Sequence, residues 1–309
     1  MYDFNCSTND NKRMRKGIMI KNCFNYVGSK DRMYPTLDSN FDKSKKYFID
    51  LFCGSGVVGV NAANNYERVI LNDACWQMTK TLQYFRDNDF KIILKKLSNI
   101  IKEYRLSKEN KEGYLSLREE FNSDAYNELV FDPIMFYALL THSFNYNIHI
   151  NSSGKFSVPS GYKRSYFSEK LKNKLEAFQW ELHENKNKIT IKNKNFSELV
   201  MDASKIISNC MFYVDPPYYS SDASYSRIYY LGKWDESKER QLYATLDYIN
   251  QQGGSFLLSN VIENNGRTNY ILYEWCKKYN TINISSDYSN CNYQRKNKGN
   301  TKEIIVRNY

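Results

Sequence analysis

The sequence predicts an α/β fold in which a doubly wound sheet of seven strands is interrupted by a mostly helical insertion. Short apolar, strand-like runs alternate with helical patterns over residues 47–71 and again over 188–306. Between these blocks, helical periodicity interrupts the alternation. Such alternation is typical of a mostly parallel sheet covered by helices on both faces. We expect residues 1–90 and 185–309 to form one domain and residues 91–184 to form the inserted one.

The first block predicts a strand, a glycine turn, a helix and a second strand. The strand pattern over 47–52 leads directly into Cys53-Gly54-Ser55-Gly56. An apolar helical stretch follows at 57–63, and residues 68–71 predict a second strand that ends near Asp73. This order of elements describes a nucleotide-binding βαβ unit.

Three helices are predicted inside the insertion. The second of them has Asp132 as its N-cap and Pro133 as its first helical residue. A polar, aromatic segment over 143–166 follows this helix and carries turn signals at Ser153-Gly154 and Ser160-Gly161. The first and third helices are indicated by apolar faces made of Ile93, Leu97, Ile100, Ile101 and Tyr104, and of Leu171, Leu175, Phe178 and Leu182.

Five further strand patterns bring the expected total to seven. A helix over 236–250, closed by Gly253-Gly254, separates two of them. Ligands of doubly wound sheets bind beyond the carboxyl ends of the strands, so residues that follow a strand are the first candidates for a site. The five patterns cover residues 188–191, 211–214, 255–258, 282–284 and 304–306.

The composition favours an intracellular protein that meets an anionic partner. The chain has 309 residues, with 44 Lys and Arg against 34 Asp and Glu, a formal net charge of +10. This surplus suits nucleic acid, although a Lys- and Asn-rich coding bias accounts for the charge equally well, while the 27 tyrosines also suit stacking on bases. Seven cysteines without CxxC spacing predict reduced thiols and no metal site. No apolar run reaches a membrane-spanning length, so we expect a soluble, cytoplasmic protein with no membrane partner.

Two glycines and an acid define the first candidate site. Asp50-Leu51-Phe52-Cys53-Gly54-Ser55-Gly56 places the glycines directly after a strand, where backbone can approach a ligand closely. The spacing differs from the dinucleotide fingerprint, and no Lys-Ser/Thr pair follows as a phosphate loop requires. Asp73 ends the next strand, where a carboxylate can accept both ribose hydroxyls of an adenosyl ligand; a helix N-cap is the alternative role.

The second candidate site is Asp215-Pro216-Pro217-Tyr218, directly after an apolar strand. Two prolines stop strand pairing and stiffen the backbone, so a carboxylate and carbonyls are held at the strand tip. Asp-Pro alone is common in turns, but an acid, two prolines and an aromatic residue at a strand end are a rare combination.

This combination suits chemistry on an aromatic amine. Such an amine is a poor nucleophile because its lone pair is delocalised into the ring. Acceptors fixed on its protons localise the lone pair and favour attack on an electrophilic methyl sulfonium. The Asp215 side chain and the Pro216 carbonyl can be these acceptors, while Tyr218 offers a ring face to a base that has left the duplex stack.

Together these motifs resemble the Dam-like adenine-specific DNA methyltransferases in which a target-recognition insertion precedes Asp-Pro-Pro-Tyr. Asn25-Tyr26-Val27-Gly28-Ser29-Lys30 resembles the N-terminal cofactor motif of that family, with Tyr26 where Trp is usual. Asn195-Phe196 resembles the pair that flanks the cofactor adenine, with Asn in place of the acid. Further similarity to the insertion and to the late strands lies in residues 117–122, 156–159, 258–260 and 303–309.

The resemblance implies a Rossmann-like catalytic domain that uses S-adenosyl-L-methionine, and no metal, to methylate the exocyclic amine of a flipped adenine in double-stranded DNA. It also implies a cognate restriction endonuclease as a partner if the chain is half of a restriction-modification system. The implied catalytic residues are Asp215, Pro216, Pro217 and Tyr218. The implied cofactor residues are Tyr26, Gly28, Lys30, Phe52, Gly54, Gly56, Asp73, Asn195, Phe196 and Asp215. The implied DNA-contacting residues are Asn145, Asn147, His149, Asn151, Lys155, Lys163 and Arg164.

One departure from the family pattern concerns the target sequence. Members that read GATC usually carry an Arg near the position of His149. Histidine cannot supply the bidentate fork that Arg offers to guanine. We therefore expect the segment from 145 to 163 to select a target other than GATC.

Three alternatives to DNA adenine methylation stay open at this point. A cytosine amino-methyltransferase shares the geometry of attack, although Asp rather than Ser before Pro-Pro-Tyr favours adenine. An RNA substrate is the second alternative, and a non-catalytic DNA-binding regulator of the same fold is the third. The intact Asp215-Pro216-Pro217-Tyr218 motif argues against the regulator, whereas a carbon-5 cytosine mechanism is disfavoured because the sequence contains no Pro-Cys dipeptide.

Overall fold

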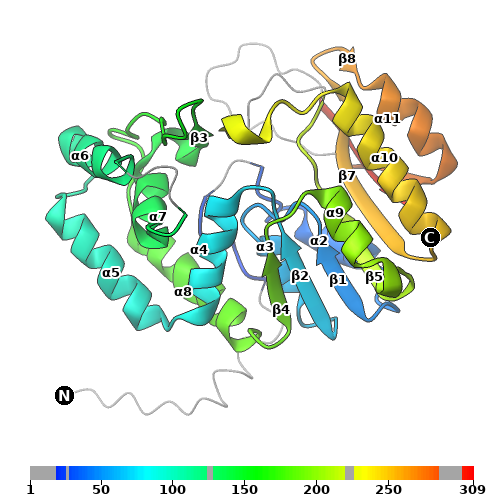
Figure 1. The fold of residues 1–309 in the computed structure, drawn as a ribbon, viewed down its shortest axis with the longest axis horizontal. Helices are drawn as coiled ribbons and strands as arrows, with labels where there is room; N and C mark the ends of the chain where they lie inside the picture. Colours follow the sequence, from blue (N-terminus) through cyan, green and yellow to red (C-terminus); the bar gives the residue numbers. More distant parts are fainter. Residues whose placement is uncertain (1–18, 26–27, 124–127, 220–225, 285–300) are drawn as a thin grey trace.

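The computed structural model describes residues 19–25, 28–123, 128–219, 226–284 and 301–309, and an eight-stranded sheet lies at its centre (Figure 1). The strands follow the order β4-β2-β1-β5-β7-β10-β9, with β8 paired to β7. Their bounds are β1 (Tyr47–Asp50), β2 (Arg68–Asn72), β4 (Ile189–Lys192), β5 (Cys210–Val214), β7 (Ser255–Asn264), β8 (Arg267–Thr268), β9 (Asn280–Ile284) and β10 (Thr301–Arg307).

Each of the seven strand patterns in the sequence overlaps one strand of this sheet, but the expected count of seven is wrong for the described residues. The additional strand is β8, which folds back on the end of β7. Asn265 and Gly266 between them both have positive φ angles, 52° and 78°. Two such residues make the tight turn that hairpins prefer, and a two-residue strand is too short to show a sequence pattern.

The order of the strands reverses between β1 and β5. Strands β4, β2, β1, β5 and β7 are mutually parallel, while β10 is antiparallel to both of its neighbours. The chain moves outward from β1 through β2 to β4, and then returns to lay β5 along the other side of β1. Doubly wound sheets bind their ligands at such a switch point, beyond the carboxyl ends of the strands. Asp50 pairs with Tyr213 there, so the segments after β1 and β5 start side by side.

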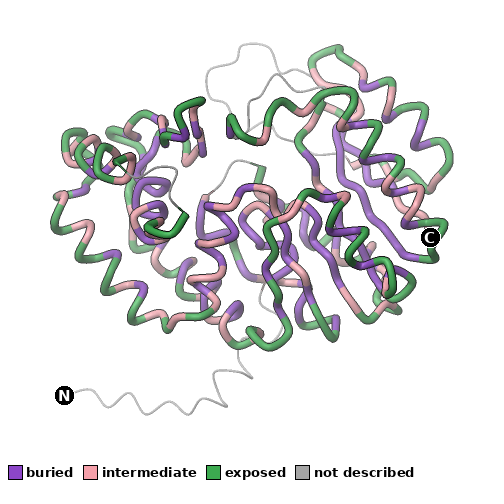
Figure 2. The backbone as a smooth tube through the Cα atoms, viewed as in Figure 1, coloured by how far each residue is buried: buried purple, intermediate pink, exposed green. Residues whose placement is uncertain are grey.

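Successive side chains of a strand point to opposite faces of the sheet, and both faces are buried beneath helices. In β1, for example, Phe48 belongs to one hydrophobic cluster and Ile49 to the other. Figure 2 shows the buried trace along the strands and the exposed segments on the outer helices. The cluster on the first face includes residues of α2 (Tyr34–Asn40), α3 (Val57–Ala62), α4 (Trp76–Asp87), α7 (Pro133–His142) and α8 (Glu169–Glu184), and the cluster on the second face includes residues of α9 (Phe196–Asp202), α10 (Glu236–Gln251) and α11 (Tyr270–Trp275).

The segment between β2 and β4 is mostly helical, and Figure 1 places α5 and α6 on the side of the molecule away from α10 and α11. Asp132 caps α7 as expected, because its carboxylate accepts hydrogen bonds from the backbone N–H groups of Ile134 and Met135. The sequence analysis missed α6, on which only Tyr114 and Leu117 are buried. The remaining elements are α5 (Phe90–Glu103), α6 (Lys111–Phe121), η1 (Phe144–Tyr146), β3 (Ile148–Ile150), η2 (Ser204–Asn209), β6 (Ser226–Ile228), η3 (Tyr229–Leu231) and η4 (Cys276–Lys278).

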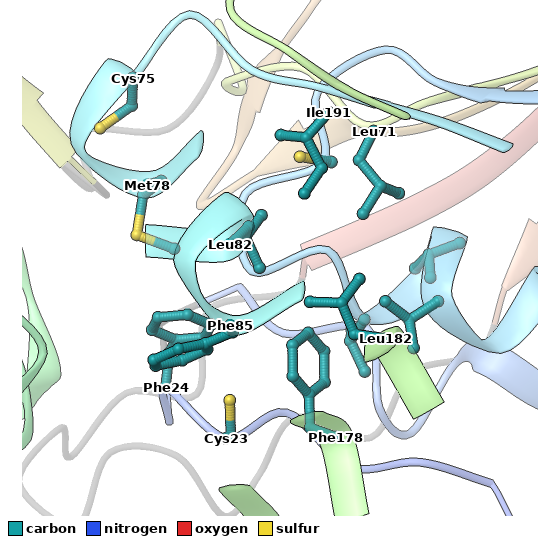
Figure 3. Close-up of a cluster of buried hydrophobic side chains, with 14 of the residues drawn as sticks. Cys23, Phe24, Leu71, Cys75, Met78, Leu82, Phe85, Phe178, Leu182 and Ile191 are labelled. Atoms are coloured by element: carbon teal, nitrogen blue, oxygen red, sulfur yellow. The ribbon is translucent and has the colours of Figure 1, made fainter. Parts of the chain in front are cut away.

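The helical segment shares one hydrophobic cluster with the first face of the sheet (Figure 3). Phe24 stacks on Phe85 of α4, with ring centroids 5.7 Å apart, and meets Phe178 of α8 edge-on at 6.2 Å. The Tyr137 hydroxyl of α7 donates a hydrogen bond to the Cys23 carbonyl at 2.8 Å. The chain just before Gly28 and Lys30 is therefore anchored in the core. The boundaries of a separate inserted domain stay a prediction.

A second, two-stranded sheet joins β3 to β6, and the two strands run parallel. After β3 the chain turns and comes back, because the Ser157 N–H donates to the His149 carbonyl at 2.9 Å and Ile150 bridges Phe156. The small sheet thus connects the middle of the helical segment to the chain that follows Tyr218. Among the described residues, no helix has both the length and the apolar character needed to cross a membrane.

Candidate functional site

Asp215 is the first residue beyond β5, a strand that is buried along its whole length. The carboxylate is surrounded by donors. Lys30 Nζ lies 2.7 Å from Oδ2, while the Ser259 and Tyr218 hydroxyls donate to Oδ1 at 3.0 and 3.2 Å. Pro216 and Pro217 carry no backbone N–H and cannot continue the sheet, so the chain leaves it here. The structure therefore brings Asp215, Tyr218 and Lys30 together.

Lys30 supplies a buried positive charge to this network, with a side chain that is 7% exposed. Besides its contact with Asp215, the ammonium donates to the Tyr218 hydroxyl at 2.9 Å and to the Gly28 carbonyl at 3.4 Å. Burial is the largest single effect on Lys30 and opposes its charge, but the neighbouring groups together, Asp215 foremost among them, outweigh burial and raise the pKa of Lys30. Lys30 is consequently a cation at neutral pH.

Gly54 and Asp73 also meet, at the ends of β1 and β2. The Gly54 N–H donates to Asp73 Oδ2 at 2.8 Å, and the Cys75 N–H donates to Oδ1 at 2.8 Å. Asp73 thus holds the glycine turn and binds Cys75, the N-cap residue of α4, rather than capping that helix itself. Burial raises the pKa of Asp73, although these backbone hydrogen bonds act in the opposite direction.

The turn after β1 requires glycine at two positions. Gly54 and Gly56 have φ angles of 49° and 74°, in the region that side chains with a Cβ disfavour. At Gly56 a Cβ would also lie 3.3 Å from the side chains of Leu71 and Leu82. The turn can therefore bring its backbone close to a ligand at the switch point.

Three aromatic rings gather near the ends of β1 and β4. Phe52 lies 5.4 Å from Phe196 and 5.7 Å from Trp234, and the last two rings are 5.9 Å apart. The Trp234 indole N–H donates to Glu239, which fixes the ring against α10. Asn195 is exposed, and its side-chain oxygen accepts a hydrogen bond from the Ser197 N–H at the start of α9.

Asp50 is a buried carboxylate to which the sequence analysis gave no role. Its side chain is 1% exposed, and Oδ2 accepts a hydrogen bond from the Gly59 N–H at 3.2 Å. Oδ1 has no hydrogen-bond partner among the described residues. Burial raises the pKa of Asp50 well above its ordinary value, and the nearby Asp215 carboxylate adds to this effect. An unsatisfied buried oxygen beside the switch point indicates a position where a ligand donor fits.

Sequence reasoning also missed the roles of Trp234 and Ser259. Trp234 precedes α10 without any motif spacing, and its partners Phe52 and Phe196 are far away in the sequence. Ser259 was noticed only as part of a family segment. Its position within the apolar run of β7, where a polar residue needs a partner, was the available signal.

The residues expected to contact DNA lie along one segment, from η1 to Arg164. Its ends are tied by hydrogen bonds from the Phe144 N–H to the Pro159 carbonyl and from the Gly161 N–H to the His142 carbonyl, both at 2.8 Å. The exposed members are Asn145, Lys155, Lys163 and Arg164, while Asn147, His149 and Asn151 are half-buried.

Two of these residues have local structural roles as well. The Asn151 side-chain oxygen accepts hydrogen bonds from the N–H groups of Ser153 and Lys155, both at 3.0 Å, and so holds the turn after β3. His149 Nδ1 lies 3.1 Å from the Ser157 hydroxyl. By contrast, the guanidinium of Arg164 lies 5.6 Å from the centre of the Phe144 ring, on an exposed surface.

Tyr26, the aromatic residue of the N-terminal motif, lies outside the described residues. Within the described part of the chain, no cluster of three or more His, Cys, Asp or Glu side chains is arranged to hold a metal ion.

Comparison with known proteins assigns the chain to a family. A family model described as D12 class N6 adenine-specific DNA methyltransferase matches residues 26–290. The chain is similar to the modification methylase StsI of Streptococcus sanguinis (31% identical over 297 residues), to the type II methyltransferase M.FokI of Planomicrobium okeanokoites (32% over 312) and to the modification methylase LlaI of Lactococcus lactis subsp. lactis (28% over 295). These matches cover 94%, 98% and 94% of the chain but 43%, 46% and 43% of the relatives. The chain thus spans less than half the length of these curated relatives.

Loss of the buried Lys30 should destabilise the fold more than loss of an exposed lysine that also pairs with a carboxylate. Lys30→Met leaves a largely buried carboxylate without its cation, so the free energy of unfolding should fall by roughly 1.5–3 kcal/mol in urea denaturation. Lys172→Met, which removes one partner of the exposed pair with Glu169, is the control and should change it little. Equal losses in the two variants would show that Lys30 does not carry the expected charge interaction.

Proposed function

Since the chain belongs to the D12 class of N6 adenine-specific DNA methyltransferases, we propose that it transfers a methyl group from S-adenosyl-L-methionine to the exocyclic amine of adenine in double-stranded DNA. The observation that carries this proposal is the network of Asp215, Tyr218 and Lys30 at the switch point of the sheet. It puts hydrogen-bond acceptors and an aromatic ring at the place where such folds bind ligands.

The described residues fit an adenosyl amino acid as the cofactor. The rings of Phe52, Phe196 and Trp234 offer an apolar wall for the adenine. Each oxygen of Asp73 carries one backbone donor and keeps a lone pair for a ribose hydroxyl. The unpartnered oxygen of Asp50 suits an ammonium donor at the methionine end. When bound, the cofactor supplies a methyl group on a positively charged sulfur that leaves as a neutral thioether.

Asp215 and Pro216 act on the target amine. The Asp215 carboxylate and the Pro216 carbonyl accept the two amine hydrogens, which concentrates the lone pair on nitrogen. As the nitrogen–carbon bond forms, the nitrogen becomes cationic, and Asp215 stands beside it to receive the surplus proton. Asp215 Oδ2 carries one described donor, Lys30, so it retains room for a second donor from the substrate.

Tyr218 must move for the base to enter. Its hydroxyl is hydrogen-bonded both to Lys30 and to Asp215 Oδ1, and its side chain is half-buried. A flipped adenine that stacks on the Tyr218 ring would donate its amine hydrogen to Asp215 in place of the Tyr218 hydroxyl, which donates to Oδ1 in this structure. The strong anchoring of Lys30 keeps the positive charge in place while this exchange occurs.

Residues 91–184 form the target-recognition region in this proposal. The segment from Asn145 to Arg164 presents exposed cations beside aromatic rings, including Lys163 at 5.2 Å from the Tyr162 ring and Arg164 over Phe144. Cations of this kind bind phosphate, and the net charge of +10 acts in the same direction. Because His149 stands where the family's GATC readers carry Arg, the target differs from GATC. A cognate restriction endonuclease is the proposed cellular partner.

The chemistry is tested by Asp215→Ala. Removing the acceptor should lower the methyl-transfer rate at least about a hundredfold, while thermal stability and DNA affinity change much less. The rate is measured with radiolabelled S-adenosyl-L-methionine and DNA free of adenine methylation. Asp42→Ala, which removes a carboxylate that binds Ser255 at the other end of the sheet, is the control and should keep the wild-type rate. Near-wild-type turnover by Asp215→Ala would remove the residue from the reaction.

The cofactor assignment is tested by Asp73→Ala. Loss of the charged acceptor should weaken S-adenosyl-L-methionine binding by roughly 1.5–3 kcal/mol in titration calorimetry. Asp73→Asn keeps one acceptor oxygen for the Gly54 turn and should lie between the wild type and the alanine variant. An unchanged affinity in both variants would place the ribose elsewhere.

The specificity proposal is tested by mapping methylated adenines in DNA from cells that express the wild type or His149→Arg. A bidentate Arg–guanine contact contributes about 1–3 kcal/mol of discrimination, so the variant should favour guanine at one position where the wild type does not. Lys155→Ala is the control, because loss of a phosphate contact weakens binding to all sequences alike. A wild-type map restricted to GATC would contradict the inference from His149.

A further inference from the structure

Ser259, a buried residue of β7, donates a hydrogen bond to the carboxylate of Asp215. We propose that Ser259 is a positioning residue: its hydroxyl fixes the orientation of Asp215, and Tyr213 in turn fixes the hydroxyl. This inference rests on the proposed function, since the orientation of Asp215 matters only if Asp215 accepts the target amine.

The register of the sheet places Ser259 opposite Asp215. Strands β5 and β7 are parallel, with Val214 paired to Leu258, so the next residues along the two chains are Asp215 and Ser259. Strand β5 ends at Val214, whereas β7 continues to Asn264 and is held on its other side by β10. Ser259 therefore belongs to the rigid sheet, and its side chain is 1% exposed. It reaches Asp215 from a fixed position.

The hydrogen bonds around Ser259 have a defined direction. The Ser259 Oγ atom lies 3.0 Å from Asp215 Oδ1 and 3.1 Å from the Tyr213 hydroxyl. An ionised carboxylate only accepts, so Ser259 gives its single proton to Asp215 and must accept from Tyr213. Burial raises the pKa of Tyr213 well above its ordinary value, which keeps this hydroxyl protonated. The chain of donation runs from Tyr213 through Ser259 to Asp215.

Ser259 is needed because the second hydroxyl that donates to Asp215 Oδ1, that of Tyr218, has to move away when the base binds. Oδ1 also accepts from Tyr218, whose ring is the proposed stacking surface for the base. When Tyr218 turns to the base, Ser259 still holds Oδ1 and Lys30 still holds Oδ2, so the plane of the carboxylate is retained. Without Ser259, the carboxylate is fixed at Oδ2 alone and can rotate away from the amine.

A proton relay is a less suitable role for this chain of hydroxyls. Tyr213 is 1% exposed and pairs within the sheet with Asp50 and Leu257, and its only described side-chain hydrogen bond is to Ser259. A proton passed inward from Asp215 would stop at a buried phenol. Positioning, which requires no net transfer, is consistent with this geometry.

The test compares Ser259→Ala with Ser255→Ala in single-turnover methyl transfer, at saturating S-adenosyl-L-methionine and DNA free of adenine methylation. Ser255 is a matched control, because it is a buried serine of the same strand that donates to an Asp carboxylate, Asp42, far from the site. Both variants should lose similar thermal stability. Ser259→Ala should react about tenfold more slowly, with an unchanged Kd for the cofactor in titration calorimetry, and Ser255→Ala should keep the wild-type rate.

Two further variants separate positioning from a structural role. Ser259→Thr keeps the hydroxyl and should restore the rate to within about threefold of the wild type. Tyr213→Phe should slow the reaction in the wild-type background but add nothing to Ser259→Ala, since Tyr213 acts through Ser259. A Ser259→Ala rate equal to that of wild type, a failure of the threonine to rescue, or additive effects of the two variants would overturn the inference. Absence of methyl transfer by the wild-type protein would instead reject the proposed function.

Discussion

The contact between the Lys30 ammonium and the Asp215 carboxylate connects the parts of this molecule that the proposed chemistry needs. Lys30 comes from an N-terminal segment anchored by Phe24 in the core, and Asp215 comes from the tip of β5. Neither charge is well exposed, so each loses most of its hydration and the pair contributes little net stability. Such an arrangement is more easily explained by a functional requirement for charge at this place than by folding.

The reversal of strand order explains why so many separate motifs meet at this pair. Strands β1 and β5 are neighbours although the chain between them forms three of the described strands, β2, β3 and β4, and most of the described helices. The carboxyl ends of β1, β2 and β5 bring the glycine turn, Asp73, Asp50 and Asp215 to one edge of the sheet. Several carboxylates within one edge repel each other, and the structure responds by giving Asp73 two backbone donors and Asp215 a buried lysine. Asp50 receives only one donor, and burial raises its pKa instead.

The parts of the fold that the sequence predicts are those determined by local pattern. Apolar strand runs, the Asp132 cap and the glycine turn all lie within a few residues of chain, where propensity and sterics act directly. The missed parts depend on contacts between distant residues. The position of Trp234 depends on its contacts with Phe52 and Phe196. The position of Ser259 depends on the register of β7 against β5. Helix α6 was missed because it buries too few apolar residues to show a period.

The small sheet of β3 and β6 joins the proposed recognition segment to the chain that follows Asp215-Pro216-Pro217-Tyr218. A two-stranded sheet is marginal by itself, and pairing distant segments costs loop entropy. Burial of Ile148, Ile150 and Ile228 offsets that cost. His149 lies on β3 between two of these buried residues, and β6 lies on the chain that continues from Tyr218. The backbone that is proposed to read the target sequence is thus hydrogen-bonded, through β6, to a segment that follows the proposed stacking residue in the chain.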